Sequence, residues 1–286
     1  MTPLALLLAA SSMSAPVPKD EKTDFTWKLT KGDVFYVTLE TDTDIKLTPP
    51  ERLALAVNRF TQRTEGVWKL TVATADDDRV VFDLETVSYH ESAAGNTGKL
   101  NGVKEVSAAA GVKFSLTFDK AFRLSKVSDG EEWDKLRARL SQLTGMHSAK
   151  GVGRAFEHFL QVVPGGRQEK EWKRKEDVLD KDAKTSDTWT RRAKVDSVKD
   201  GVATVTTETD LEGKNEANER KLTVPFERKA EKCPGTFTFD TRTGRLVRFE
   251  ETLTITGLSG AKDQGIPCDC TTKTVATLSA KPPKQK

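Results

Sequence analysis

The chain has 286 residues, of which 36% are hydrophobic and 31% charged, and its 46 basic and 43 acidic residues give a formal net charge of +3. This composition excludes a disordered polyelectrolyte and predicts a folded protein long enough to bury a large core. The basic residues form no long stripe, so we predict no nucleic-acid partner.

The N-terminus carries an apolar run, Leu4–Ala10, followed by small residues. The run is too short to span a bilayer and fits the apolar part of a secretory signal peptide. We therefore assign residues 1–15 to a signal peptide and predict export to the periplasm or the extracellular space. No basic residue precedes the run, and Pro16 follows the expected cleavage point, so a disordered tail and a misplaced start site stay open as alternatives. No other apolar run approaches the length of a membrane span, so we predict no transmembrane segment.

Residues 24–127 form the first strand-rich half. Apolar residues alternate from Phe35, and the same face becomes threonine-rich toward Leu47. Residues 53–57 fit a helix or a strand, and we favour a strand. A hairpin with arms near residues 68–72 and 80–84 follows, and Asp76–Asp78 forms a solvated turn rather than a calcium loop.

Residues 128–163 are expected to form two helices between the halves. Trp133, Leu136 and Leu140 recur at helical spacing in the first. The second covers Arg154–Val163, with an apolar stripe that includes Phe156, Phe159 and Leu160, and it ends before Pro164. His158 lies off this stripe, so we interpret it as solvated rather than catalytic.

Residues 164–280 form the second strand-rich half. A hairpin turns at Asp200-Gly201, a second hairpin covers residues 235–249, and a closing strand covers residues 271–279. Residues 281–286 are predicted to be a disordered tail.

The two halves repeat a pattern. Gly235–Phe249 has the form of Val112–Val127: a strand that ends in Thr-Phe-Asp, a short turn, then Arg-Leu and a second strand. An earlier pair of hairpins aligns at an offset of 123 residues, and this pair at 121–122 residues. We therefore predict one mainly β (α+β) domain over residues 16–280. It would be a large curved antiparallel sheet or open barrel built from two similar halves, with about two covering helices.

This order of elements, with the helix pair followed by Val-Val-Pro-Gly-Gly and Trp172, resembles a family of exported bacterial proteins of unknown function that is frequent in planctomycete-like genomes. The likeness covers roughly Asp24–Ala280. The architecture is also similar to that of the LolA and LolB lipoprotein carriers, in which a curved sheet and covering helices enclose an apolar pocket. The chain lacks a lipobox cysteine, so lipoprotein anchoring is not implied, and neither resemblance supplies catalytic residues.

Motifs with a known catalytic mechanism are missing from the sequence. There is no G-x-S-x-G, H-E-x-x-H, Walker or C-x-x-C motif, and His90, His147 and His158 belong to no motif. We therefore predict no enzymatic activity, no cofactor and no metal.

Two functions fit such an exported cell-envelope protein. The first is binding of an apolar ligand, such as a lipid, in the concave sheet. Its candidate lining residues are Phe35, Val37, Leu39, Trp68, Phe82, Phe114, Phe118, Trp133 and Phe159, and the alternative is that they fill a sealed core. The second function is a structural or protein-interaction module that presents a polar sheet face or edge strands to an envelope protein, with the threonine-rich residues 203–209 and 271–279 as candidates.

The three cysteines, Cys233, Cys268 and Cys270, fit a disulfide with one thiol left over, free thiols, or a zinc site that lacks an evident fourth ligand. Residues that begin two strands flanking a third lie about 9–10 Å apart, whereas a disulfide needs Cα atoms within about 7 Å. We therefore predict a Cys233–Cys268 bridge rather than Cys233–Cys270.

Overall fold

The computed structural model describes residues 22–48, 59–95, 102–108, 111–139, 148–180, 185–215, 226–259 and 266–283. The signal-peptide assignment and the strand expected at residues 53–57 lie outside these ranges. Fourteen strands and two helices form within them. In the first half these are β1 (Thr23–Asp24), β2 (Val34–Leu47), β3 (Arg59–Ala75), β4 (Arg79–Gly95), β5 (Gly102–Ala108), β6 (Lys113–Asp119) and β7 (Leu124–Ser128). The helices are α1 (Glu131–Arg139) and α2 (Ala149–Leu160). The second half holds β8 (Arg167–Gln168), β9 (Glu171–Asp180), β10 (Thr185–Lys199), β11 (Val202–Asn215), β12 (Phe226–Asp240), β13 (Arg245–Ser259) and β14 (Ile266–Ser279).

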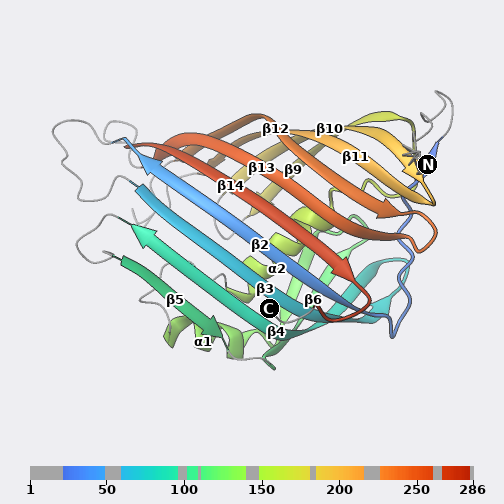
Figure 1. Ribbon diagram of the computed structural model, residues 1–286, viewed down its shortest axis with the longest axis horizontal. Coiled ribbons are helices and arrows are strands. Elements are labelled where there is room, and N and C mark those ends of the chain that lie inside the picture. Colours follow the sequence, from blue (N-terminus) through green and yellow to red (C-terminus); the bar gives the residue numbers. More distant parts are fainter. Residues whose placement is uncertain are drawn as a thin grey trace, which may run out of the picture.

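One antiparallel sheet dominates the molecule and curves around α2 (Figure 1). Its strand order is β7-β6-β4-β3-β2-β14-β13-β12-β11-β10-β9, and β5 pairs with the far part of β4. Strands β2 and β14 join the two halves along a ladder of twelve residue pairs. The end strands β7 and β9 do not pair with each other, so the sheet stays open. This confirms the predicted fold class.

The repeat is visible in the hydrogen-bond register of the strands. Val72 stands opposite Phe82 between β3 and β4, and Val195 stands opposite Val205 between β10 and β11. A register shift follows directly in each ladder, after Val72 and after Val195. The two units therefore share an irregularity as well as a pairing scheme.

The second hairpin of each unit repeats in the same way. The β6–β7 ladder shifts register at Phe118, and the β12–β13 ladder shifts at Phe239. The aspartate after each phenylalanine closes the turn: the Asp119 carboxylate accepts the backbone N–H groups of Ala121 and Arg123, and the Asp240 carboxylate accepts those of Arg242 and Thr243. The repeated Thr-Phe-Asp motif therefore encodes a bulged hairpin with a side-chain-capped turn.

Helix α2 packs its apolar face on the first unit. Phe156, Phe159 and Leu160 are buried, as predicted, and the Trp68 ring of β3 meets the Phe156 ring edge to face with centroids 5.7 Å apart. Gly153 permits the close approach, since a Cβ there would lie 2.8 Å from the Leu124 side chain of β7. The helix begins five residues earlier than expected because the Ser148 hydroxyl accepts the Gly151 N–H and caps it.

Helix α2 also covers the edge of β7. The Glu157 carboxylate accepts the backbone N–H of Leu124 at 3.2 Å. Close to the opposite edge, Arg174 of β9 donates to the backbone carbonyl of Gln161, directly after α2. The helix therefore lies between the two open edges, and its Glu157 satisfies a backbone N–H of β7 that a closed barrel would pair with another strand.

The three cysteines are free thiols in the structure, so the predicted Cys233–Cys268 bridge is not formed. Cys233 lies on β12 and Cys268 on β14, and β13 runs between them. Two strand spacings separate their backbones by more than a disulfide can span. The argument that disfavoured Cys270 therefore applies to Cys268 as well.

The threonine-rich segments 203–209 and 271–279 belong to β11 and β14, which have neighbours on both sides. They do not provide the edge strands expected for an interaction module. The strands at the two ends of the sheet are β7 and β9 instead.

Candidate functional site

The inward face of the sheet changes abruptly from apolar to polar between two adjacent rows of paired residues. The first row is almost entirely apolar and runs from β4 to β10 through Tyr89, Gly66, Leu39, Ala276, Phe249, Phe237, Val205 and Val195. The second row lies two residues further along every strand and continues to β9, through Glu91, Thr64, Thr41, Thr274, Glu251, Gly235, Thr207, Ala193 and Trp172. The second row marks the end of the main core and holds two buried carboxylates.

Glu91 is the carboxylate on the first unit. It is 1% exposed and accepts hydrogen bonds from the Tyr89 hydroxyl and the Gln62 amide. Burial raises the pKa of Glu91 above its usual value, with the Tyr89 hydrogen bond acting in the opposite direction. The hydrogen-bond partners of Glu91 are thus both uncharged groups.

Glu251 is the carboxylate on the second unit, and its surroundings are cationic. Its two oxygens contact His158 Nε2 at 2.6 Å and the Thr209 hydroxyl at 2.7 Å, and Arg191 lies 3.7 Å away. Burial alone would raise the pKa of Glu251, but the charge and hydrogen bond of His158, the Arg191 charge and the Thr209 hydrogen bond outweigh it and lower the pKa to about 2. Glu251 is therefore a buried anion that ties β13 to α2 and β11.

The guanidinium of Arg191 has weaker hydrogen-bond and charge partners than the Glu251 carboxylate has. Its Nε donates to the Thr209 hydroxyl at 3.3 Å, and its distance to Glu251 exceeds that of a hydrogen bond. Burial lowers the pKa of Arg191, and the charges of Glu251 and Glu176 only partly oppose this effect. The guanidinium therefore bears a desolvation cost that its protein partners do not fully offset.

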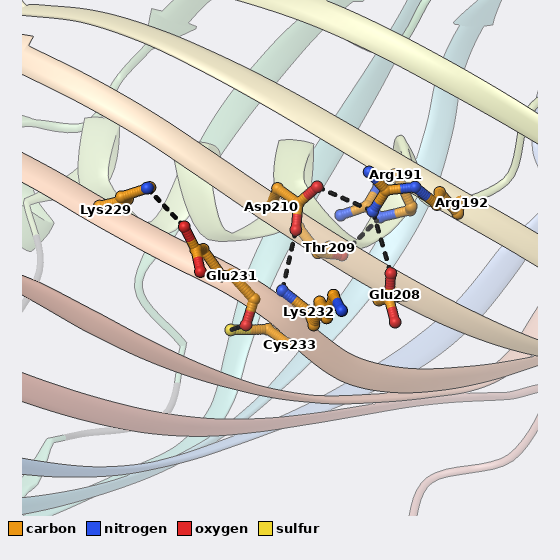
Figure 2. A network of polar contacts seen from close by, with 9 residues as sticks. All are labelled: Arg191, Arg192, Glu208, Thr209, Asp210, Lys229, Glu231, Lys232 and Cys233. Carbon is orange, nitrogen blue, oxygen red and sulfur yellow. Dashed lines mark hydrogen bonds and ion pairs between the residues drawn. The ribbon is translucent and has the colours of Figure 1, made fainter.

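An irregularity in the pairing of β11 with β12 lies beside Thr209 and shapes this part of the site. Figure 2 shows Asp210 of β11 accepting the backbone N–H of Lys232 and contacting Arg192. Lys232 adopts a left-handed backbone with φ of +50°, and the β12 register shifts around it. The shift turns the Cys233 side chain inward, where its sulfur accepts the N–H of Thr254 on β13 at 3.3 Å.

A cavity of about 260 Å³ opens between α2 and the second unit, next to Glu251. Its charged walls come from Arg154, Glu157 and His158 of α2 and from Arg174, Glu176, Asp187 and Arg191 of β9 and β10. Its apolar walls are Val162, Trp172, Val178 and Trp189. The His158 ring lies 5.2 Å from the Trp189 ring, centroid to centroid.

The nine residues predicted to line a ligand pocket lie together, but in the packed core. Each of them is at most 6% exposed, and they form one hydrophobic cluster with α2. None of the nine lines the cavity beside Glu251. Their placement corresponds to the core-filling alternative.

The prediction that His158 is solvated is wrong, because its side chain is 24% exposed and bound to Glu251. Glu251 and Arg191 were not singled out from the sequence. Arg191 carried one usable signal: it falls on the inward side of the alternation Trp189, Arg191, Ala193, Val195, where a charge calls for a buried partner. Glu251 carried no such signal, since its partner His158 is 93 residues away.

Across the described ranges, no group of three or more His, Cys, Asp and Glu side chains is placed to hold a metal ion. No helix in those ranges has the length and apolar character needed to cross a membrane.

Comparison with known proteins finds likeness in fold only. No family model and no curated protein matches the chain. A structure described as showing lipid–protein interactions in lipovitellin matches with a TM-score of 0.50 and 8% identity, over 91% of this chain and 26% of the lipovitellin chain. The protein thus spans about a quarter of that relative, and the likeness shows a shared sheet architecture.

Two further structures align over most of their length with low TM-scores. DynF from the dynemicin biosynthesis pathway of Micromonospora chersina gives a TM-score of 0.26 and 6% identity, over 96% of this chain and 92% of DynF. An outer membrane channel from Pseudomonas putida F1 gives a TM-score of 0.29 and 9% identity, over 92% of this chain and 99% of the channel.

Proposed function

We propose that this is an exported, non-enzymatic cell-envelope protein that binds an apolar ligand, such as a lipid, inside the curve of its sheet. The proposed site is not the nine-residue set in the core. It is the part of the inward face beyond the polar row, together with the cavity beside Glu251.

The observation that carries the proposal is a second apolar cluster beyond the polar row. Leu211, Ala230, Cys233 and Leu253 form this satellite cluster, and the partly exposed Trp189 and Ile255 pack against it. Trp189 also lines the cavity. The four residues of the satellite cluster are buried, so the partly exposed Trp189 and Ile255 give the apolar surface beside the cavity, and a cavity with apolar walls and a few polar groups is the usual form of a small-molecule site.

The sheet architecture shared with lipovitellin supports the same class of ligand, because the lipovitellin structure is one of lipid–protein interactions. The architectural resemblance to LolA and LolB points in the same direction. Export is supported by the apolar run Leu4–Ala10.

The contacts of Thr209 support a non-enzymatic role. Its hydroxyl donates to the Glu251 carboxylate, whose pKa of about 2 makes it a weak general base, and His158 is hydrogen-bonded to Glu251 instead of to this hydroxyl. A nucleophile activated by His158 would need the opposite arrangement.

The test is a titration with an apolar fluorescent dye, together with mass spectrometry of organic extracts of the protein purified from its native host. We expect saturable binding near one dye per chain and a copurified lipid. Ile255→Ser should weaken dye binding, whereas Val247→Ser, on the same strand and already exposed, should not. A protein that binds no dye and carries no lipid would contradict the proposal and favour a structural role in the envelope.

A further inference from the structure

We propose that the bound ligand has an acidic head group, a carboxylate on an acyl chain, and that Arg191 binds it inside the cavity. This inference rests on the proposed function and names the chemistry of the ligand.

Most of the charges around the cavity are already paired. Arg154 contacts Glu157 within α2, and Arg174 contacts Glu176 along β9. Asp187 pairs with Arg228 of β12 through both carboxylate oxygens. Beyond these three pairs, Glu251, His158 and Arg191 form one group, and Glu176 adds a weaker electrostatic attraction for Arg191.

Glu251 is already engaged by groups closer than Arg191. His158 and Thr209 contact its two oxygens at 2.6 and 2.7 Å, whereas Arg191 approaches no closer than 3.7 Å. Two basic side chains therefore face this one carboxylate, and Arg191 is the one without a direct hydrogen bond to it. An incoming anion would give Arg191 the close partner that Glu251 does not.

Arg191 also has hydrogen-bonding capacity to spare. A guanidinium carries five N–H donors, and among the described residues Arg191 uses one of them in a hydrogen bond, to Thr209. Its side chain is 11% exposed and lines the cavity. The planar donor fork matches a carboxylate, and charge-assisted hydrogen bonds of this kind are strongest where water is excluded.

The walls of the cavity fit the start of an acyl chain. Trp172 and Trp189 lie on neighbouring strands beside Arg191, and Trp189 leads to Leu211 and Leu253 of the satellite cluster. The volume of about 260 Å³ is below the roughly 300–1,000 Å³ of pockets that enclose a drug-sized ligand. It suits a head group and the first methylene groups, with the rest of the chain running past the partly exposed Trp189 toward Ile255.

The test compares three ligands with the same sixteen-carbon chain: the carboxylic acid, its methyl ester and the primary amine. Each displaces the apolar dye at pH 7.5, below the critical micelle concentration. We expect the acid to bind at least about tenfold more tightly than the ester, because hydrogen bonds to a charged group contribute about 1.5–3 kcal/mol.

Arg191→Gln should lower the affinity for the acid by at least about tenfold and leave the ester within about twofold. Arg192→Gln is the matched control. It changes the neighbouring arginine, which is on the opposite face of β10 and pairs there with Glu208 and Asp210, as Figure 2 shows. Arg191→Lys keeps the charge without the donor fork and should give an intermediate affinity, which preserves the test if the glutamine variant does not fold.

Each outcome separates the inference from the proposed function. Equal affinity for acid and ester, or no effect of either Arg191 substitution, would overturn the acidic head group and leave the apolar site in place. Tighter binding of the amine would also overturn it, in favour of recognition by the cavity carboxylates. Failure of all three ligands and of the dye to bind would contradict the proposed function itself.

Discussion

In the first unit of the repeat Trp68 stands opposite Thr86, and in the second Arg191 stands opposite Thr209 at the same sequence offset. One layer closer to the core, Leu70 pairs with Leu84 in the first unit, and Ala193 pairs with Thr207 in the second. The backbone scheme is the same, but the second unit has smaller and more polar side chains at these layers. A duplicated register can thus support a sealed core on one side and a polar cavity on the other.

Helix α2 has an apolar face toward the core of the first unit and a polar face toward the cavity of the second unit. Phe156 and Gly153 meet Trp68 and Leu124 of the first unit, whereas Glu251 of the second unit binds His158. The apolar face contributes most of the stability through burial, and the polar face leaves a hollow, because the hydrogen-bonded groups hold their neighbours at fixed distances instead of collapsing. The predictions below test this division.

The largest effect is expected at the apolar contact of α2. Trp68→Ala should lower the free energy of unfolding by about 3–5 kcal/mol, since a 2% exposed indole would leave a cavity under Phe156. The measurement is urea unfolding followed by circular dichroism. Trp189→Ala, at the partly exposed tryptophan of the second unit, should cost clearly less, and equal costs would refute the difference between the units.

The next largest effect is expected at Glu251. Its pKa is about 2 in the folded protein, against 4.5 for an unperturbed glutamate, so it stabilises the fold by about 3 kcal/mol above pH 4.5. That contribution is lost as the pH falls from about 4.5 to about 2, because the unfolded chain binds the proton first. Glu251→Gln should therefore be about 3 kcal/mol less stable than the wild type at pH 7 and nearly equal to it near pH 2.

Urea unfolding at several pH values checks this prediction. Glu250→Gln, at the neighbouring residue, which pairs with Lys273 on the outer face, is the matched control and should show a much smaller difference. A stability difference between wild type and Glu251→Gln that does not change with pH would contradict a buried anion at Glu251.

A smaller effect on stability, of the same size in both units, is expected at the two repeated turns. Asp119→Ala and Asp240→Ala each remove a carboxylate oxygen that accepts two backbone N–H groups. Each substitution should cost about 1–2 kcal/mol in free energy of unfolding. Thermal unfolding of both variants tests whether the units share this turn, and a cost confined to one of them would show that they do not.

The smallest effect concerns the cysteines and leaves stability unchanged. Burial raises the pKa of all three thiols, but Cys233 is only 3% exposed whereas Cys268 and Cys270 are half-buried. A thiol reagent should therefore modify two cysteines in the folded protein and the third only after denaturant is added. Fewer than three reactive thiols in the denatured, unreduced protein would show a disulfide.

Much of the fold follows from local patterns in the sequence. The alternation from Phe35 to Leu39, the Asp200-Gly201 turn and the repeated Thr-Phe-Asp hairpin each act over a few residues, so they predict strands, turns and their pairing. The apolar stripe of α2 was predictable for the same reason. The start of α2 was missed because Ser148, which caps it, follows a segment without a periodic pattern.

The candidate site was not predictable in this way. The nine residues chosen as ligand-lining were chosen for size and apolarity, which are also the properties that fill a core. His158 was judged from its own helix alone, where the face away from the apolar stripe looks solvated. The second unit covers that face, and no local pattern records the contact.

The sequence by itself determined many of the strands, the two helices, the repeat and the hairpin turns, because hydrophobic alternation and turn chemistry depend on neighbouring residues. Only the tertiary structure decided which part of the inward face is filled and which part stays hollow. That outcome depends on where α2 lies between β7 and β9 and on the meeting of His158, Arg191 and Glu251 from three separate elements. Burial and electrostatic pairing act through space. His158 and Glu251 are 93 residues apart in the chain and come into contact only because the sheet curves around the helix.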